Sequence, residues 1–212
     1  MDTSGQVMAT SIPVIGITGG IGSGKSFVAQ CFASFDCVIA NADDNAKIAL
    51  NRSKTQKVLV QWWGKEVVSE DGQTNRAMIA SIVFNDDEAR QKLEALIHPA
   101  VREMQNEQFT QAPETTTALI IDAPLLLETD LHTLCDAVIF VQASDEIRLS
   151  RVMESRGWDE NELRRREEAQ LPLDKKADSA DYVIINESDQ SSVMTQEKQI
   201  LDDIHGQHID KS

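Results

Sequence analysis

Residues 19–26 read Gly-Gly-Ile-Gly-Ser-Gly-Lys-Ser, a pattern of residue types that can surround a phosphate group. Glycines allow positive φ and let backbone N–H groups approach phosphate oxygens. Lys25 would place a positive charge near the terminal phosphates, and the Ser26 hydroxyl would bind Mg²⁺. The segment predicts a site for a nucleoside triphosphate. The residues expected to contact the nucleotide in this segment are Gly20, Ile21, Gly22, Ser23, Gly24, Lys25, Ser26 and Phe27.

A phosphate-binding loop of this kind works between a strand and a helix, where N–H groups and the helix dipole converge on an anion. The apolar run 12–17 precedes the loop and predicts the strand. After the loop, apolar residues at helical spacing predict the helix: Phe27, Val28, Cys31, Phe32 and Phe35. This context favours a phosphate-binding loop over a chance glycine turn.

Four more short runs rich in Val and Ile are candidate strands: 37–40, 118–122, 137–142 and 182–185. Helical stretches lie between them, which is typical of a parallel sheet covered on both faces. The predicted fold class is therefore α/β, with a doubly wound, mostly parallel five-stranded sheet.

The segment 41–117 is longer than one crossover needs, so we expect an inserted helical subdomain at 51–114. Apolar residues at helical spacing predict helices at 54–63, 76–84 and 86–97. The Asp71-Gly72 pair marks a turn between the first two helices. We expect the third helix to end at His98 and a new one to start at Pro99.

Six of the ten arginines fall in one stretch: Arg148, Arg151, Arg156, Arg164, Arg165 and Arg166. We expect a helical lid at 144–180, with Ser144 as an N-cap, a break at Gly157 and a second helix from about Asp159. Small kinases close such lids over phosphates, because charge is stabilised best where water is excluded. The alternative for some of these arginines is a solvated helix, since acids are interleaved at pairing distance.

The 212 residues, 41% of them hydrophobic, are enough for one globular domain, which we place at 12–212 after a flexible tail at 1–11. Its core is expected at 12–50, 115–143 and 181–212. The net charge of −15 argues against a nucleic-acid or anionic-membrane partner. The arginine-rich stretch must therefore make the phosphate site locally basic on an otherwise acidic protein.

Cys31, Cys37 and Cys135 form no C-x-x-C pair, so they predict neither a disulfide framework nor a zinc site. The polar residues 1–11 lack the pattern of a secretion signal, and no apolar run reaches membrane-spanning length. We therefore expect a cytoplasmic protein.

Two acids follow strand candidates, where α/β folds place ligand-facing groups. Asp43 would accept a proton from an attacking hydroxyl, although capping of the next helix is the simpler alternative. Asp122 ends the run Leu-Ile-Ile-Asp and has the position of a Walker B acid that holds Mg²⁺, a pattern also common by chance. His98 is expected to have a structural or substrate-orienting role.

Several segments, taken in order, resemble the dephospho-coenzyme A kinase family across nearly the whole chain. The matching segments are 16–26, 41–43 (Asn-Ala-Asp), 72–76 with Phe84, His98-Pro99, 122–128 (Asp-Ala-Pro-Leu-Leu-Leu-Glu), Arg166 with Gln170, and 180–186 (Ala-Asp-Tyr-Val-Ile-Ile-Asn). The phosphate-binding loop alone fits many proteins. The later segments in this order are far more specific.

The resemblance implies transfer of the γ-phosphoryl group of ATP to the ribose 3′-hydroxyl of dephospho-coenzyme A, with Mg²⁺. It implies Asp43 as base, the loop and Lys25 as the ATP site, and Arg151 as the first lid candidate. Asn186 would belong to the adenine pocket, and the inserted helices would bind the acceptor. The acceptor-binding residues would be Asp43, His98, Pro124 and Leu125, and the metal-binding residues Ser26 and Asp122.

Two positions depart from the family pattern. Asn41 stands where the family has the first Asp of an Asp-Ala-Asp stretch; we expect it to orient the loop by hydrogen bonding. Arg156 lies five residues after Arg151, whereas the family usually has a second arginine after four. Whether Arg156 corresponds to that second arginine stays open.

Two other functions remain possible from the sequence. A kinase for a nucleoside monophosphate or another small molecule would share the loop and lid, with acceptor-phosphate arginines such as Arg76, Arg90 and Arg102 in the insertion. A GTPase-like switch or nucleotide sensor is disfavoured because the chain has no Asn-Lys-x-Asp guanine motif. We expect a monomer or a weak homo-oligomer.

Overall fold

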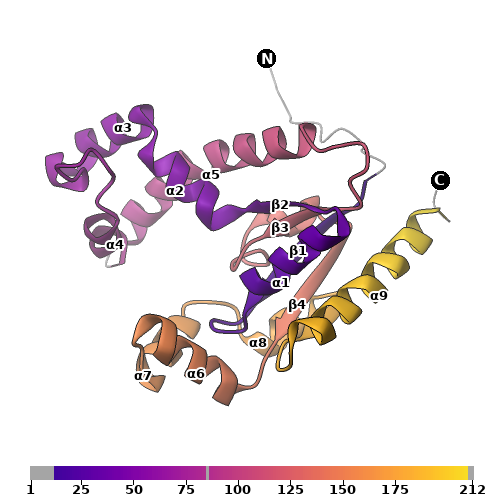
Figure 1. Cartoon of the computed structure of the whole chain (residues 1–212). Coiled ribbons are helices and arrows are strands. Elements are labelled where there is room, and N and C mark those ends of the chain that lie inside the picture. Colours follow the sequence, from indigo (N-terminus) through magenta and orange to yellow (C-terminus); the bar gives the residue numbers. More distant parts are fainter. Residues whose placement is uncertain (1–11, 85, 210–212) are drawn as a thin grey trace. The chain divides into compact units, whose positions relative to one another are not determined.

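The computed structural model of this chain describes residues 12–84 and 86–209, so the expected tail at 1–11 lies outside the described residues. The chain divides into two compact units (Figure 1). The first comprises residues up to Ala40 and from Ala112 onward, and the second comprises Asn41–Gln111. Each unit is described by itself.

The first unit contains a parallel five-stranded sheet in the order β2-β3-β1-β4-β5. β1 pairs in parallel with β3 and β4, and β4 pairs in parallel with β5. The strands are β1 Val14–Gly19, β2 Val38–Asn41, β3 Leu119–Asp122, β4 Ala137–Gln142 and β5 Tyr182–Ile185. The doubly wound α/β prediction is confirmed, and every predicted strand lies within two residues of its expected bounds.

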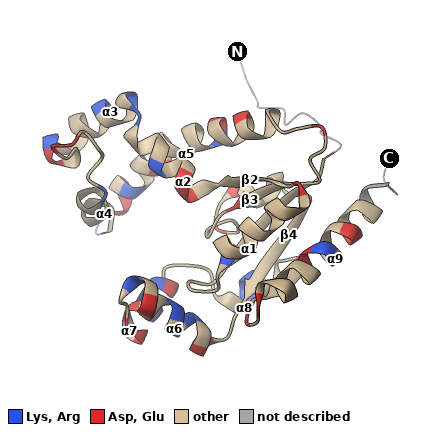
Figure 2. Cartoon of the chain, in the orientation of Figure 1, with Lys and Arg blue, Asp and Glu red and all other residues tan. Residues whose placement is uncertain are grey.

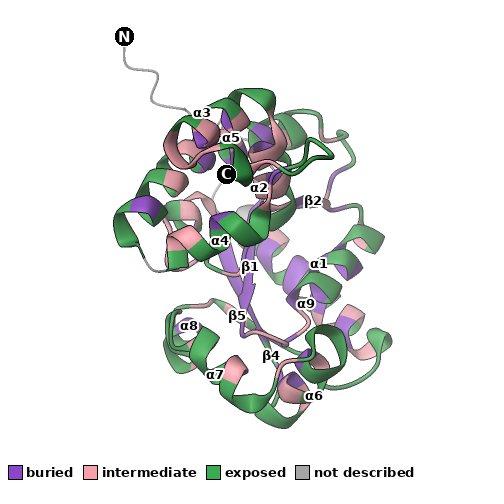
Figure 3. Cartoon of the chain, turned by 90° about the vertical axis from the view of Figure 1, so that its left-hand side faces the viewer, coloured by how far each residue is buried: buried purple, intermediate pink, exposed green. Residues whose placement is uncertain are grey.

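Helices cover this sheet because its strands are apolar on both faces. The helices of the unit are α1 Lys25–Cys31, α6 Asp145–Arg156, α7 Glu160–Glu167, α8 Leu173–Asp178 and α9 Gln190–Ile209, with 3₁₀ turns at Phe32–Phe35 and Asp130–Leu134. A core of buried residues joins the sheet to α1 and α9, including Ile17, Val28 and Leu201. Figure 3 shows β1 and β4 as largely buried strands.

The second unit is helical, with α2 Ala42–Asn51, α3 Ser53–Trp63, α4 Arg76–Phe84 and α5 Asp87–Thr110, and a 3₁₀ turn at Lys65–Val67. The predicted turn at Asp71-Gly72 is present, with Gly72 at a φ of 78°. Ala49 of α2 is buried against Ile97 and Val101 of α5. Because of this packing the unit begins at Asn41, ten residues before the start expected for the insertion.

The expectation that a helix ends at His98 and a new one starts at Pro99 is wrong. Helix α5 runs without a break through Pro99. A proline inside a helix removes one hydrogen bond and costs about 3 kcal/mol. Ile97 and Val101, one on each side of Pro99, are both buried, and this burial on both sides offsets the cost of continuing the helix.

The predicted break at Gly157 is confirmed, since Gly157 ends α6 at a φ of 67°. Asp159 caps α7 by accepting a hydrogen bond from the Glu162 amide at 2.8 Å. Ser144 is the N-cap residue of α6, but its side chain makes no capping hydrogen bond. Within residues 12–84 and 86–209, no helix is long and apolar enough to cross a membrane.

Candidate phosphate-binding site

The phosphate-binding loop connects β1, which ends at Gly19, to α1, which begins at Lys25. Gly22 and Gly24 adopt φ values of 79° and 82°, in the region that other residues rarely occupy. A Cβ on Gly22 would lie 2.6 Å from the Arg148 carbonyl oxygen, and one on Gly24 would collide with the Asn186 amide. Both glycines are therefore required by backbone conformation and by space.

Lys25 and Asp122 meet next to this loop as a buried ion pair. The Lys25 ammonium donates to Asp122 Oδ1, and the two side chains are 10% and 1% exposed. The sheet register explains the meeting, because Ile17 of β1 lies beside Asp122 of β3. The structure thus brings together the loop lysine and the acid predicted to hold the metal.

Arg151 and Asn186 hold the backbone of the loop. The Arg151 guanidinium donates to the Ser23 carbonyl at 3.0 Å and to the Asn186 carbonyl at 2.9 Å. The Asn186 side-chain amide donates to the Ser23 carbonyl at 2.8 Å. Asn186 is buried, and its side-chain amide contacts the loop. Its role toward adenine stays a prediction.

Arg148 belongs to the arginine cluster, and nothing in the sequence distinguishes it as a site residue. Its side chain is 4% exposed and donates to the Ile21 carbonyl at 3.0 Å. It also pairs with Asp145 at 2.9 Å and with Glu167. Burial alone would lower the pKa of the Arg148 guanidinium, but its hydrogen bonds to Glu167 and Asp145 outweigh burial, and the pKa is raised. Arg148 is therefore a fixed cation behind the loop.

Lys176 of α8 fixes the segment that follows β3. It is fully buried and donates to the Pro124 carbonyl at 3.1 Å and the Gln170 side chain at 3.0 Å, and it pairs with Glu128 at 2.8 Å. Thr18 donates to the same Pro124 carbonyl at 3.2 Å. Sequence reasoning missed Lys176, because a lysine among Asp174 and Lys175 has the pattern of a solvated helix.

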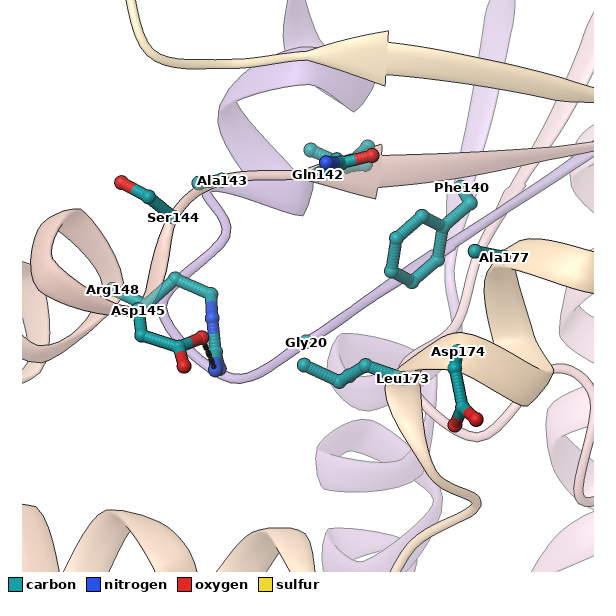
Figure 4. Close-up of a pocket in the computed structure, with 11 residues that line it drawn as sticks. Gly20, Phe140, Gln142, Ala143, Ser144, Asp145, Arg148, Leu173, Asp174 and Ala177 are labelled. Atoms are coloured by element: carbon teal, nitrogen blue, oxygen red, sulfur yellow. Dashed lines mark hydrogen bonds and ion pairs between the residues drawn. The ribbon is translucent and has the colours of Figure 1, made fainter.

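A pocket of about 290 Å³ lies beside the loop within the first unit. It is lined by Gly20, the end of β4, the start of α6 and α8. Figure 4 shows Phe140 and Leu173 on one side and the Arg148–Asp145 pair on the other. The pocket combines apolar and charged walls next to the phosphate-binding segment.

The other predicted site residues of the first unit differ in exposure. Ser26 is exposed in the first turn of α1, and Phe27 and Leu125 are each 43% exposed. Gly20 is buried, while Ile21 and Pro124 are half-buried.

Asp43 and His98 belong to the second unit. Asn41 is the N-cap of α2, and its side chain accepts a hydrogen bond from the Asp44 amide at 2.9 Å. Capping is therefore done by Asn41, and Asp43 is an exposed residue in the first turn of α2. His98 is exposed on α5.

Surface pairing accounts for three of the lid arginines. Arg164 pairs with Glu160 at 2.5 Å, and Arg165 and Arg166 each pair with Glu162 at 2.7 Å. Figure 2 shows the interleaved charges on α6 and α7. The guanidinium groups of Arg156 and Arg166 lie 4.7 Å and 4.2 Å from the Trp158 ring centroid. The solvated-helix alternative thus holds for α7, whereas Arg148 and Arg151 of α6 contact the loop.

The described part of the chain contains no group of three or more His, Cys, Asp or Glu side chains placed to hold a metal ion. Magnesium in phosphoryl-transfer sites is usually held by one or two protein oxygen ligands together with the phosphates and water. The Ser26 hydroxyl and the Asp122 carboxylate are hard oxygen donors of this kind.

A known protein family matches most of this chain. The family model for dephospho-CoA kinase matches residues 13–192. A dephospho-CoA kinase of Syntrophotalea carbinolica is 41% identical over 82% of this chain and 83% of its own length. One from Bacillus anthracis is 37% identical over 89% of this chain and 95% of its own.

Among solved structures, a crystal structure from Thermus thermophilus has a TM-score of 0.78 and 31% identity, covering 91% of this chain and 97% of its own. A dephospho-CoA kinase from Campylobacter jejuni has a TM-score of 0.59 and 22% identity, covering 92% of this chain and 98% of its own, and supports the fold alone. The match to the family model over most of the chain, together with these relatives, shows that the chain belongs to the dephospho-CoA kinase family.

Proposed function

We propose that this chain transfers the γ-phosphoryl group of ATP to the ribose 3′-hydroxyl of dephospho-coenzyme A, giving coenzyme A and ADP. The family match supports this acceptor. The observation that carries the chemistry is the buried Lys25–Asp122 pair beside a loop whose glycines have the geometry of an anion site. A kinase for another small molecule would share this loop, but the family match disfavours it.

The loop and Lys25 bind the phosphates of ATP in this proposal. Phosphoryl transfer depends on positioning and charge neutralisation more than on covalent chemistry. The loop supplies N–H groups at the start of α1, and Lys25 supplies a charge that the Asp122 contact keeps in place. Arg151, on α6 and against the loop, adds a second cation near the transferred group.

Asp43 is the proposed base for the acceptor hydroxyl. Its carboxylate is exposed, and the cap of α2 is made by Asn41, which leaves Asp43 available for a substrate. The N-terminal turn of a helix stabilises negative charge. His98, Pro124 and Leu125 are proposed to contact the acceptor.

Ser26 and Asp122 are the residues that would hold Mg²⁺. Bound magnesium neutralises charge on the β- and γ-phosphates during transfer. Lys25 and Ser26 are adjacent at the start of α1, so the same turn presents an ammonium group and a hydroxyl.

The test is ADP release from ATP and Mg²⁺ with dephospho-coenzyme A, with adenosine monophosphate as the control acceptor. We expect turnover only with dephospho-coenzyme A, and a loss of about 100-fold or more in kcat for Asp43→Asn, as for loss of a general base. Asp44→Asn is a matched control, since Asp44 is the exposed neighbour that pairs with Lys47 at 2.5 Å. Turnover with the control acceptor alone would favour a different kinase.

We propose a cytoplasmic enzyme that acts on a small-molecule substrate. The three cysteines are free, which is consistent with the proposed reducing cytoplasm. The net charge of −15 supports a small-molecule substrate over a nucleic acid. A monomer or weak homo-oligomer is proposed, and sedimentation analysis tests it.

A further inference from the structure

The carbonyl groups of the phosphate-binding loop are held by side chains from elsewhere in the first unit. When backbone N–H groups turn toward an anion, neighbouring carbonyl groups turn away and need donors of their own. The Ser23 carbonyl accepts from Arg151 and Asn186. The Ile21 carbonyl accepts from Arg148 at 3.0 Å.

Arg148 is held by charges from two helices. Asp145 lies one turn earlier on α6, and Glu167 is the last residue of α7. A buried cation is costly unless it is paired and hydrogen-bonded. The two carboxylates supply that pairing, so the guanidinium is fixed between the loop, α6 and α7.

Arg148 also packs against the loop by shape. A Cβ on Gly20 would lie 3.1 Å from the Arg148 guanidinium, and one on Gly22 would lie 2.6 Å from its backbone oxygen. Arg148 thus lies close to three consecutive loop residues, Gly20, Ile21 and Gly22. Figure 4 shows its side chain beside Gly20, next to Asp145. The loop cannot shift at these residues without moving Arg148.

We propose that Arg148 is a positioning residue for nucleotide binding. It holds the Ile21 carbonyl so that the loop amides stay directed at the phosphates, and through Glu167 it links the loop to α7. This inference rests on the proposed role of the loop in binding ATP. Because only 4% of the side chain is exposed, Arg148 acts through the loop and does not touch the phosphates.

The experiment is calorimetric titration of Arg148→Met with ATP and with tripolyphosphate, both without acceptor, alongside steady-state kinetics. Met keeps the apolar stem and removes the donors. We expect affinity for both ligands to fall about tenfold, the cost of one lost charged hydrogen bond. KM for ATP should rise by a similar factor, while KM for dephospho-coenzyme A stays unchanged.

Arg164→Met is the matched control, because Arg164 is an exposed arginine of α7 paired with Glu160. It loses the same charge and should bind ATP as the wild type does. Arg148→Lys and Glu167→Gln keep a cation at the site and should each lower ATP affinity by a smaller factor. In the Arg148→Met background, Glu167→Gln should not lower ATP affinity further, because both changes break the same Arg148–Glu167 ion pair.

Wild-type ATP affinity in Arg148→Met or Arg148→Lys would overturn the inference. Equal rises in KM for ATP and for the acceptor would also overturn it, since the effect of the substitution would then not be confined to nucleotide binding. Because the titration contains no acceptor, it tests the effect of Arg148 on ATP affinity independently of the proposed acceptor. A wild type that binds ATP but does not phosphorylate dephospho-coenzyme A contradicts the function and leaves the Arg148 result standing.

Discussion

At the scale of single residues, Asn41 departs from the family motif and still caps the helix that follows it. The family has Asp at this position, and Asn41 here caps α2 through the Asp44 amide. Asn and Asp are about equally good N-cap residues. The side-chain oxygen that orients the start of α2 is therefore kept without the charge.

We expect Asn41→Asp to change kcat by less than tenfold and to leave the melting temperature nearly unchanged, because the cap is preserved. Asn41→Ala removes the cap and should destabilise the protein by about 1 kcal/mol. Steady-state kinetics measures kcat and thermal unfolding measures stability for both variants. A gain above tenfold in Asn41→Asp would mean that the first carboxylate takes part in catalysis and that orienting the loop is not enough.

At the scale of elements, the strands and most helices could be predicted because each has a local signal. Apolar runs rich in Val and Ile identified the strands, and Gly157 identified the end of α6. The predicted helix break at Pro99 is wrong, since burial on both sides of the proline overrides the local rule for helix breaking. Arg148 and Lys176 had no signal at all, because a buried charge is indistinguishable from a solvated one in a polar run.

Lys176 joins α8 to the segment that follows β3, so its removal should affect more than its own helix. We expect Lys176→Met to destabilise the protein by about 3 kcal/mol, because Glu128, only 18% exposed, would lose its cation and keep only the Leu171 amide as a donor. Adding Glu128→Gln should recover part of this loss. Urea unfolding measures both variants.

Lys175→Met is the control at the neighbouring position, since Lys175 is exposed, and it should change stability by less than 0.5 kcal/mol or so. If Lys176→Met were as stable as Lys175→Met, the contacts of Lys176 with Pro124 and Glu128 would contribute nothing to holding α8.

At the scale of the whole molecule, one acid lies inside the core that joins the sheet to α9. Glu197 is fully buried, and neither carboxylate oxygen has a hydrogen-bond partner among the described residues. Burial raises the pKa of Glu197 from 4.5 to about 8. At neutral pH the folded protein therefore carries this side chain mostly protonated, while the unfolded chain ionises it.

This difference makes global stability depend on pH. The folded state binds one more proton than the unfolded state between pH 4.5 and 8, so the contribution of Glu197 is fully present below that range and is lost as pH rises through it. Gln resembles the protonated acid and does not titrate. We expect Glu197→Gln to lie within about 1 kcal/mol of the wild type near pH 5, and the stability difference in favour of the variant to grow by about 4 kcal/mol up to pH 8.5.

Denaturant unfolding at several pH values measures the gap between Glu197→Gln and the wild type, with Asp203→Asn as an exposed control on the same helix. The difference in free energy of unfolding between variant and wild type is used because the other carboxylates titrate in both proteins and their contributions cancel. The control should keep a constant offset from the wild type between pH 5 and 8.5. A constant offset for Glu197→Gln as well would mean that Glu197 is ionised in the folded state and that its carboxylate reaches water or a cation.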